Sequence, residues 1–407
     1  MMRYVPIPIA MLEVGKPLPV NVVSDTGQLL LRKGQPIVSA QHREKLHGFN
    51  ASTTASDALA WQRAYERMVH ELLRSGMEVQ EIAKHPMPSE IKESDYVVGR
   101  QLHGGWLDLQ EVLRGILYQG GLAISPMERL LGIEKKAMVL LKNDTDDTLF
   151  CLFQALTNDA LGYCATHALL CAVVCELTAA KLGMDALHRQ SLVSAALTMN
   201  MAMARDQDSM ARQASDLTDW QRSLIAEHPA KGAELLQSLG VDDAVQLDLV
   251  RWHHAPDDPQ GDPANVAARR LLALADTFVA RTAARKSRAS QSPVKAVKTM
   301  VMGAEGDALG VGSAMAQAVG FYPPGSYVQL VNGDIAVAVQ RGARANTPWV
   351  ISIVDKDAMP LTKYVCKNTA EPANAIATPV NYEKVKVAVS GDKVRRARER
   401  IPVSATA

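Results

Sequence analysis

Between residues 149 and 340, the hydrophobic positions of the chain recur with the period of an α-helix. Long apolar-periodic stretches follow one another at 150–157, 161–182, 187–204, 217–239, 242–254, 264–285 and 293–302. Runs that favour strands are rare before the last portion of this region. The pattern predicts a mainly α protein built around an all-helical bundle.

Both ends of the helical region carry strand and turn signals instead. Near the N-terminus, 20–23 and 29–31 are apolar runs on either side of an Asp-Thr-Gly turn, and a short helix at 39–46 follows. After the bundle, 327–331 and 335–339 flank Asn332-Gly333, a dipeptide that favours a tight hairpin, and 350–354 add a third strand.

These patterns divide the chain into four parts. Residues 1–55 form a small β-rich domain, 56–145 a helical linker region, 146–345 the helical domain with its hairpin, and 346–407 a short strand and a tail. The small and polar run 51–58 is expected to be a linker. The tail is expected to be flexible and solvated, because basic residues crowd it.

Composition narrows the class of protein. The 407 residues are 47% hydrophobic and 21% charged, as in an ordinary globular protein with more than one domain. The net charge of +1 gives no long-range field for nucleic acid or an anionic membrane, so neither partner is expected. We expect no membrane span, because no stretch approaches roughly 20 apolar residues. The proline-broken N-terminus does not resemble a signal peptide, and five cysteines without C-x-x-C spacing suit a reduced, cytoplasmic protein.

Five potential metal ligands lie in the helical region at wide and uneven spacing. They are His167, His228, His253, His254 and Asp276. Each taken singly could be a hydrogen-bonded core residue. The adjacent pair His253-His254 is harder to explain in that way. Neighbouring side chains on a helix point about 100° apart, so both reach one site only if that site is large or binuclear.

The sequence around these residues contains five short motifs in a fixed order. They are YCATH at 163–167, LTDW with EHP at 217–229, HHAPDDPQGDP at 253–263, LADTFVA at 274–280 with Arg285 following, and YPPGSYVQL at 322–330. Together they resemble the bacterial HD-GYP domain, whose family hydrolyses cyclic di-GMP at a pair of metal ions. The third motif aligns without a gap on the family signature "HHE…DG.GYP". The resemblance implies an HD-type helical bundle behind a small β-rich domain, and a role in signal transduction.

One departure from this family alters the expected chemistry. The family's adjacent His-Asp pair corresponds to Met199-Asn200, and the lysine that follows it corresponds to Met203. The resemblance implies that the aspartate bridges the two metals, which requires two anionic oxygens. Asn200 is neutral, and a methionine thioether is a poor ligand for manganese, iron(II) or zinc. We therefore expect no catalytic residues and no binuclear centre.

The resemblance divides the remaining ligands between two metals. It implies His167 and Asp276 for one metal and His228, His253 and His254 for the other. Three imidazoles can hold one zinc with an open fourth position, so the expected cofactor is none or a single residual divalent metal. By the same resemblance, a bound ligand would meet Arg285, Asp258 and Gly261.

Three functions are compatible with these features. The leading hypothesis is a degenerate HD-GYP signalling protein that binds cyclic di-GMP or a protein partner, including a second copy of itself, with little or no hydrolysis. In that case Met199, Met203 and nearby methionines could fill a vacated polar cavity. The alternative is an active cyclic-di-GMP phosphodiesterase with a rearranged site, for example through Asp206 or Asp208. The third is a helical interaction scaffold that resembles the HDOD proteins, which lack metal ligands.

Overall fold

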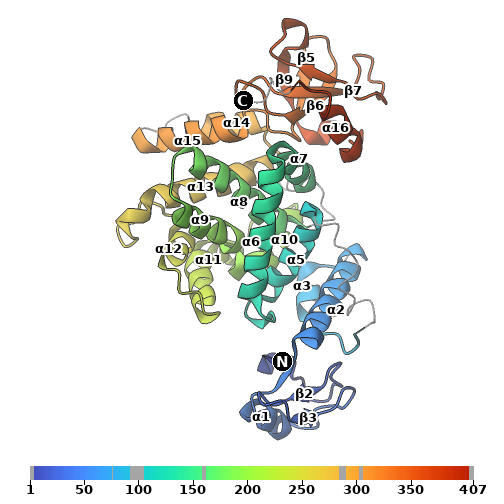
Figure 1. Ribbon diagram of the computed structural model, residues 1–407, viewed down its shortest axis with the longest axis vertical. Coiled ribbons are helices and arrows are strands. Elements are labelled where there is room, and N and C mark those ends of the chain that lie inside the picture. Colours follow the sequence, from blue (N-terminus) through green and yellow to red (C-terminus); the bar gives the residue numbers. More distant parts are fainter. Residues whose placement is uncertain are drawn as a thin grey trace. The chain divides into compact units, whose positions relative to one another are not determined.

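The computed structural model describes residues 4–75, 77–91, 105–157, 162–283, 290–301 and 306–402. The chain forms two compact units, Met1–Ile133 and Glu134–Ala407. Their helices and strands are labelled in Figure 1. Arg285 and the outermost positions of three expected helices (161, 284 and 302) lie outside the described residues.

The first unit begins with a four-stranded antiparallel sheet in the order β1-β4-β2-β3. The strands are β1 (Tyr4–Pro6), β2 (Val22–Val23), β3 (Leu29–Leu31) and β4 (Ser52–Thr54), and helix α1 (Ala40–Gly48) precedes β4. The side chain of Ser39 caps α1 by accepting a hydrogen bond from the His42 amide. Apolar residues of these elements and of helix α2 form one buried core.

The prediction that residues 51–58 form a linker is wrong. This segment contains β4 and the first residues of helix α2 (Ala55–Arg74). Ser52 and Thr53 are buried in the sheet, and the Thr54 hydroxyl accepts a hydrogen bond from the Asp57 amide at the start of α2. Small polar residues serve here as a buried strand and a helix start, which their composition alone does not reveal.

Helices make up most of the remaining described residues of the first unit. Helices α3 (Val79–Lys84), α5 (Trp106–Gln119) and the short η2 (Gly120–Leu122) lead to α6 (Pro126–Asn143). Gly120 has a φ of 52°, a conformation that glycine adopts without strain, and it ends α5. A buried ion pair joins Glu66 of α2 to Arg129 of α6.

The second unit is the predicted helical bundle. It contains α7 (Thr145–Leu156), α8 (Tyr163–Lys181), α9 (Ala186–Thr198), α10 (Ala204–Arg212), α11 (Asp219–Ser238), α12 (Ala244–Trp252), α13 (Val266–Thr282), α14 (Pro293–Val301) and α15 (Gly306–Val319). Helix α8 lies in the middle of the bundle and contacts α7, α9, α10, α13 and α15 (Figure 1). Its neighbours bury almost all of its length, which makes α8 the core of the unit.

The burial of α8 also qualifies the expectation that the chain has no membrane span. By length and composition, Tyr163–Lys181 could cross a membrane, so the statement that no stretch approaches the required length is wrong. However, 83% of its most apolar window is buried inside the bundle. A helix surrounded by protein on all sides can be as long and apolar as a membrane-spanning helix, because the protein interior and the membrane both exclude water.

A five-stranded antiparallel sheet follows the bundle in the order β8-β7-β6-β5-β9. The predicted hairpin is formed by β5 (Tyr327–Leu330) and β6 (Ile335–Gln340), with Tyr327 opposite Val337, and β7 (Trp349–Val354) extends it. Strands β8 (Cys366–Asn368) and β9 (Ile376–Val380) are absent from the prediction. Both are short edge strands, and neither has the apolar alternation of a half-buried strand.

The C-terminal tail is not the flexible segment that the sequence suggests. Helix α16 (Gly391–Arg398) buries Val394 and Ala397 in the core of the sheet. Arg398 donates to both carboxylate oxygens of Asp144, at 2.9 and 3.0 Å, and Arg395 donates to Asp147 at 3.1 Å. The basic residues therefore pair with the acidic start of α7, where carboxylates are also favoured by the helix dipole.

Replacing Val394 by alanine tests whether α16 is docked. Val394 is 1% exposed, so the loss of its two methyl groups should lower the free energy of unfolding by about 1.5–3 kcal/mol. Chemical denaturation measures this change, and limited proteolysis reports release of the tail. The matched control is Arg396→Ala on the exposed side of α16, which should change stability by less than about 0.5 kcal/mol. Equal and negligible effects of both changes would show that the helix does not pack.

Candidate metal and ligand site

His228 is oriented by a proline in the middle of a helix. Pro229 lies inside α11 and has no amide hydrogen, so the carbonyl of Ile225 four residues earlier loses its helical donor. The Nδ1 of His228 lies 2.7 Å from that carbonyl oxygen and donates to it. The Nε2 of His228 therefore carries a lone pair and points away from the helix.

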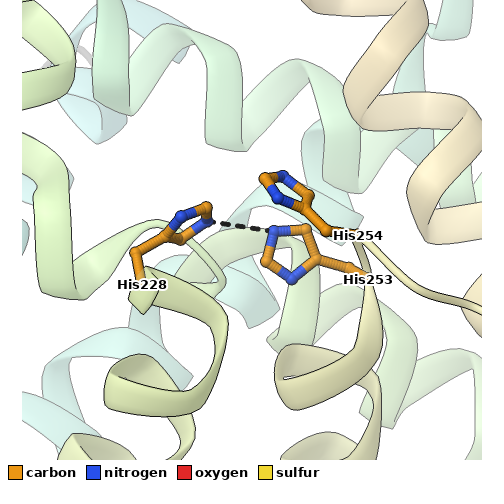
Figure 2. A group of neighbouring side chains, drawn as sticks. All are labelled: His228, His253 and His254. Atoms are coloured by element: carbon orange, nitrogen blue, oxygen red, sulfur yellow. Dashed lines mark hydrogen bonds between the residues drawn. The ribbon is translucent and has the colours of Figure 1, made fainter. Parts of the chain in front are cut away.

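His253 is oriented in the same way by a helix end. It follows the last residue of α12, where carbonyls have no intrahelical donor, and its Nδ1 donates to the Val250 carbonyl at 2.8 Å. Its Nε2 lies 3.1 Å from the Nε2 of His228, the contact drawn as a dashed line in Figure 2. Two nitrogens bound to one tetrahedral zinc lie about 3.3 Å apart, so the two rings are spaced like ligands of one metal.

Burial keeps both of these imidazoles neutral. It lowers the pKa of His228 to about 3, with the neighbouring His253 and His254 adding to the effect. It lowers the pKa of His253 to about 4, again with His254 adding to it. Neutral imidazole is the form that binds a metal, so neither ring has to lose a proton to do so at neutral pH.

His254 completes a group of three imidazoles at the mouth of the site. Its ring centre lies 4.4 Å from that of His253 and 4.8 Å from that of His228, and the side chain is 37% exposed. One nitrogen from each of the three rings lies within 4.8 Å of the others (Figure 2). The adjacent histidines do reach one site. The arrangement can hold a single zinc with an open fourth position.

A second group lies between α8 and α13. The Nε2 of His167 is 2.8 Å from Asp276 Oδ1, and the Tyr163 hydroxyl is 2.9 Å from His167 Nδ1. Burial alone would raise the pKa of Asp276, but the hydrogen bond from His167 and the nearby histidines lower it below its usual range. Asp276 Oδ2 lies 3.9 Å from His254 Nε2, so the carboxylate faces both groups.

Cys171 belongs to this second group and was missed in the sequence. Its Sγ lies 3.4 Å from the Nε2 of His167, and the ligand atoms of His167, Cys171 and Asp276 all lie within 4.8 Å of one another. Burial and the charge of Asp276 raise the pKa of this thiol well above its usual range. The available signal was its position four residues after His167, which places both on one helix face.

Asn200, at the position where the resemblance implies an aspartate, faces a small cavity between the two groups. The cavity has a volume of about 140 Å³ and is lined by His167, Asn200, Met203, Gln207, Met210, Ile225, His254, Asp276 and Ala280. Among these lining residues, Asp276 is the one carboxylate. The Nδ2 of Asn200 and the Oε1 of Gln207 are buried and have no hydrogen-bond partner among the described residues. Met203 and Met210 occupy part of the wall, as the sequence suggested, whereas Met199 is fully buried behind it.

The two aspartates considered as replacement ligands lie elsewhere. Asp208 is buried, and its Oδ1 accepts hydrogen bonds from the amides of Tyr163 and Cys164 at 2.8 and 2.5 Å. It thereby caps α8, whose N-cap residue Gly162 has no side chain to do so. Asp206 is half-buried and joins neither group of ligating side chains found in the described part of the chain.

Part of the chain is similar to known proteins. The family described as "HD domain" matches residues 152–308. The chain is 26% identical over 205 residues to the cyclic di-GMP phosphodiesterase PA4108 of Pseudomonas aeruginosa, a match that covers 49% of each protein. The chain contains an HD-GYP/HD superfamily domain. The matched region therefore spans about half the length of this curated relative.

One solved structure is similar to the chain. It is Bd1817, an HDG"Y"P protein from Bdellovibrio bacteriovorus, at 15% sequence identity and a TM-score of 0.39. The likeness covers 77% of this chain and 98% of that one. At this score it places no individual residue.

Gly261 and Asp258, which lie in the 253–263 motif, make contacts that support this loop. The buried guanidinium of Arg269 lies against Gly261, where a Cβ would come within 1.4 Å of its Nη1. Arg269 pairs with Asp248 at 3.3 Å. Asp258 Oδ1 accepts a hydrogen bond from the Gln260 amide at 2.9 Å. Neither Gly261 nor Asp258 lines the cavity, and the third expected ligand contact, Arg285, lies outside the described residues.

Replacing Gly261 by alanine should therefore destabilise the HD domain. The new methyl group must displace the buried Arg269 from Asp248, and overpacking of this kind costs about 1–3 kcal/mol. Thermal or chemical unfolding measures the loss. As a control, Gly310→Ala in α15 has no atom within 4 Å of the new Cβ and should instead stabilise by about 0.5–1 kcal/mol. A neutral Gly261→Ala would mean that the loop is not held by Arg269.

Proposed function

We propose that the HD domain of this protein is a signalling module that binds cyclic di-GMP, or a protein partner, with little or no hydrolysis. The observation that supports this most strongly is Asn200, a neutral amide at the position where the resemblance requires a metal-bridging aspartate. It lines the cavity together with His167, His254 and Asp276, which belong to the two groups of ligating side chains. The nucleotide is suggested by the curated relative, which is a cyclic di-GMP phosphodiesterase.

The chemistry of a metal pair explains why this substitution matters. Two cations a few ångströms apart need shared anionic oxygen to offset their repulsion, and together they stabilise the attacking and the leaving oxygen of an in-line displacement. Asn200 provides at most one neutral oxygen. Asp276 is the one carboxylate on the cavity wall, and its Oδ1 is already hydrogen-bonded to His167. A single metal ion held by the three imidazoles lacks the second metal ion that this reaction uses.

The competing hypotheses find less support. An active phosphodiesterase would need replacement ligands, for example Asp206 or Asp208, yet Asp208 caps α8 and Asp206 lies outside both groups. An HDOD-like scaffold does not require histidines that converge, whereas His228, His253 and His254 do so. The five cysteines are free thiols, as suits the cytoplasm that we propose for this protein.

The size of the cavity bears on how a nucleotide would bind. About 140 Å³ is small beside the roughly 300–1,000 Å³ of sites that enclose drug-sized ligands. It can receive one phosphate group but not a whole cyclic dinucleotide. We infer that the bases would lie outside the cavity, with the exposed His254 at the mouth nearest to the phosphate.

Turnover measurements test the lack of hydrolysis. With manganese or iron(II) present, the wild-type protein should not cleave cyclic di-GMP or its linear dinucleotide faster than metal ion alone. The double variant Met199→His, Asn200→Asp should gain activity of about 100-fold or more over that background, since a bridged metal pair contributes several kcal/mol. Met199→His alone is the matched control and should stay inactive. Wild-type turnover equal to that of the double variant would disprove the proposal.

Calorimetric titration tests binding of the nucleotide. Cyclic di-GMP should bind to the full-length protein and be recovered intact, with the metal content of the same sample measured. His254→Ala should weaken the affinity, because this side chain lies at the mouth of the cavity, whereas His188→Ala, at the equally exposed start of α9, should not. Absence of any binding heat at all nucleotide concentrations would exclude the nucleotide and leave a protein partner as the ligand.

A further inference from the structure

We propose that Cys171 is a metal ligand and that, with His167 and Asp276, it forms a mononuclear site for a thiophilic divalent cation such as zinc. This inference rests on the proposed function: a thiolate acts here as a terminal ligand, so Cys171 gives the altered half of the HD site a ligand without restoring the bridging carboxylate that a metal pair would share. The resemblance to the HD-GYP family implies no cysteine here. The assignment comes from the position of the thiol in the structure.

The three ligand atoms have the spacing that such a site needs. A sulfur at 2.3 Å and a nitrogen at 2.0–2.1 Å from a tetrahedral zinc lie about 3.5 Å apart. The Sγ of Cys171 lies 3.4 Å from His167 Nε2. The 2.8 Å between His167 Nε2 and Asp276 Oδ1 is a hydrogen bond, which a cation would replace after these atoms separate by about 0.5 Å.

Metal binding would displace one proton from these ligands and move another. When the metal binds, the Cys171 thiol proton is released to solvent, since thiolate is the ligating form. The proton that His167 Nε2 shares with Asp276 is replaced by the metal, and His167 then carries its proton on Nδ1. That nitrogen faces the Tyr163 hydroxyl at 2.9 Å, which can accept it. Tyr163 would thereby fix the metal-binding tautomer of His167.

The cavity beside these ligands could supply a fourth ligand. His167 and Asp276 line it, and so does Asn200, whose Nδ2 has no hydrogen-bond partner among the described residues. A water or the Asn200 carbonyl oxygen can complete the coordination. Exchange of a carboxylate and an imidazole for a thiolate shifts the preference of the site away from manganese and towards zinc, because sulfur is the softer donor.

The neighbouring cysteines provide matched controls. Cys175 lies one helical turn further along α8 and is as deeply buried as Cys171, and Cys164 lies near the start of the same helix. Neither belongs to a group of ligating side chains among the described residues. A thiol-specific signal that is lost with Cys171 but kept without Cys175 therefore comes from this site. It does not come from buried cysteines in general.

The test is titration of cobalt(II), a spectroscopic substitute for zinc, into the metal-stripped full-length protein. We expect a near-ultraviolet thiolate-to-cobalt charge-transfer band that saturates and that zinc abolishes. Cys171→Ser should remove the band, whereas Cys175→Ser and His253→Ala should leave it in place. A band that is missing from the wild-type protein, or that survives in Cys171→Ser, overturns the proposal.

A second measurement covers the case in which Cys171→Ser does not fold. X-ray absorption of the zinc-loaded wild-type protein should show one sulfur scatterer at about 2.3 Å. A shell of nitrogen and oxygen alone would overturn the proposal without any variant. Neither readout depends on nucleotide turnover. Failure of the thiolate site therefore leaves the proposed function standing, and hydrolysis by the wild-type protein would not change the absorption band.

Discussion

Two backbone carbonyls that helices leave without a donor determine how the histidines of this site can act. The carbonyl of Ile225 is freed by Pro229, and that of Val250 is freed by the end of α12. Each accepts the Nδ1 proton of a buried histidine. Because both rings are held in the same tautomer, their Nε2 lone pairs converge. One proline and one helix end thus orient the two rings so that both Nε2 atoms can bind a cation.

Around this pair of rings, the HD domain keeps the geometry of a metal site while the charge at its centre has changed. Asp276 remains between the two groups, and its hydrogen bond from His167 keeps it ionised despite burial. Asn200 adds a buried polar group without charge, and its unpaired nitrogen is the kind of cost that native proteins rarely accept without a function. Under the proposed function, this site binds a ligand without cleaving it.

The sequence predicted the elements with strong periodicity and failed where local composition misleads. The bundle and the β5–β6 hairpin followed from apolar spacing and from Asn332-Gly333. Helix α16 was missed because two buried apolar positions, Val394 and Ala397, are hidden among basic residues that pair with α7.

At the site, the resemblance identified the histidines, and their convergence could be seen only in the structure. The spacing of Cys171 from His167 was visible in the sequence, but the carboxylate of Asp276, which completes the group, comes from another helix. The same holds for Asp208, which was considered as a metal ligand and is instead a helix cap. In both cases the sequence shows the residue type but not which distant atom it meets.

Asp208 has a mechanical consequence. Its carboxylate belongs to α10, directly after the altered stretch, and holds two amides at the first turn of α8. Helix α8 carries His167 a single turn later. A displacement of α10 would pull the start of α8 with it, and the His167 ring would follow. This short linkage couples the position of α10 to the position of the His167 ring.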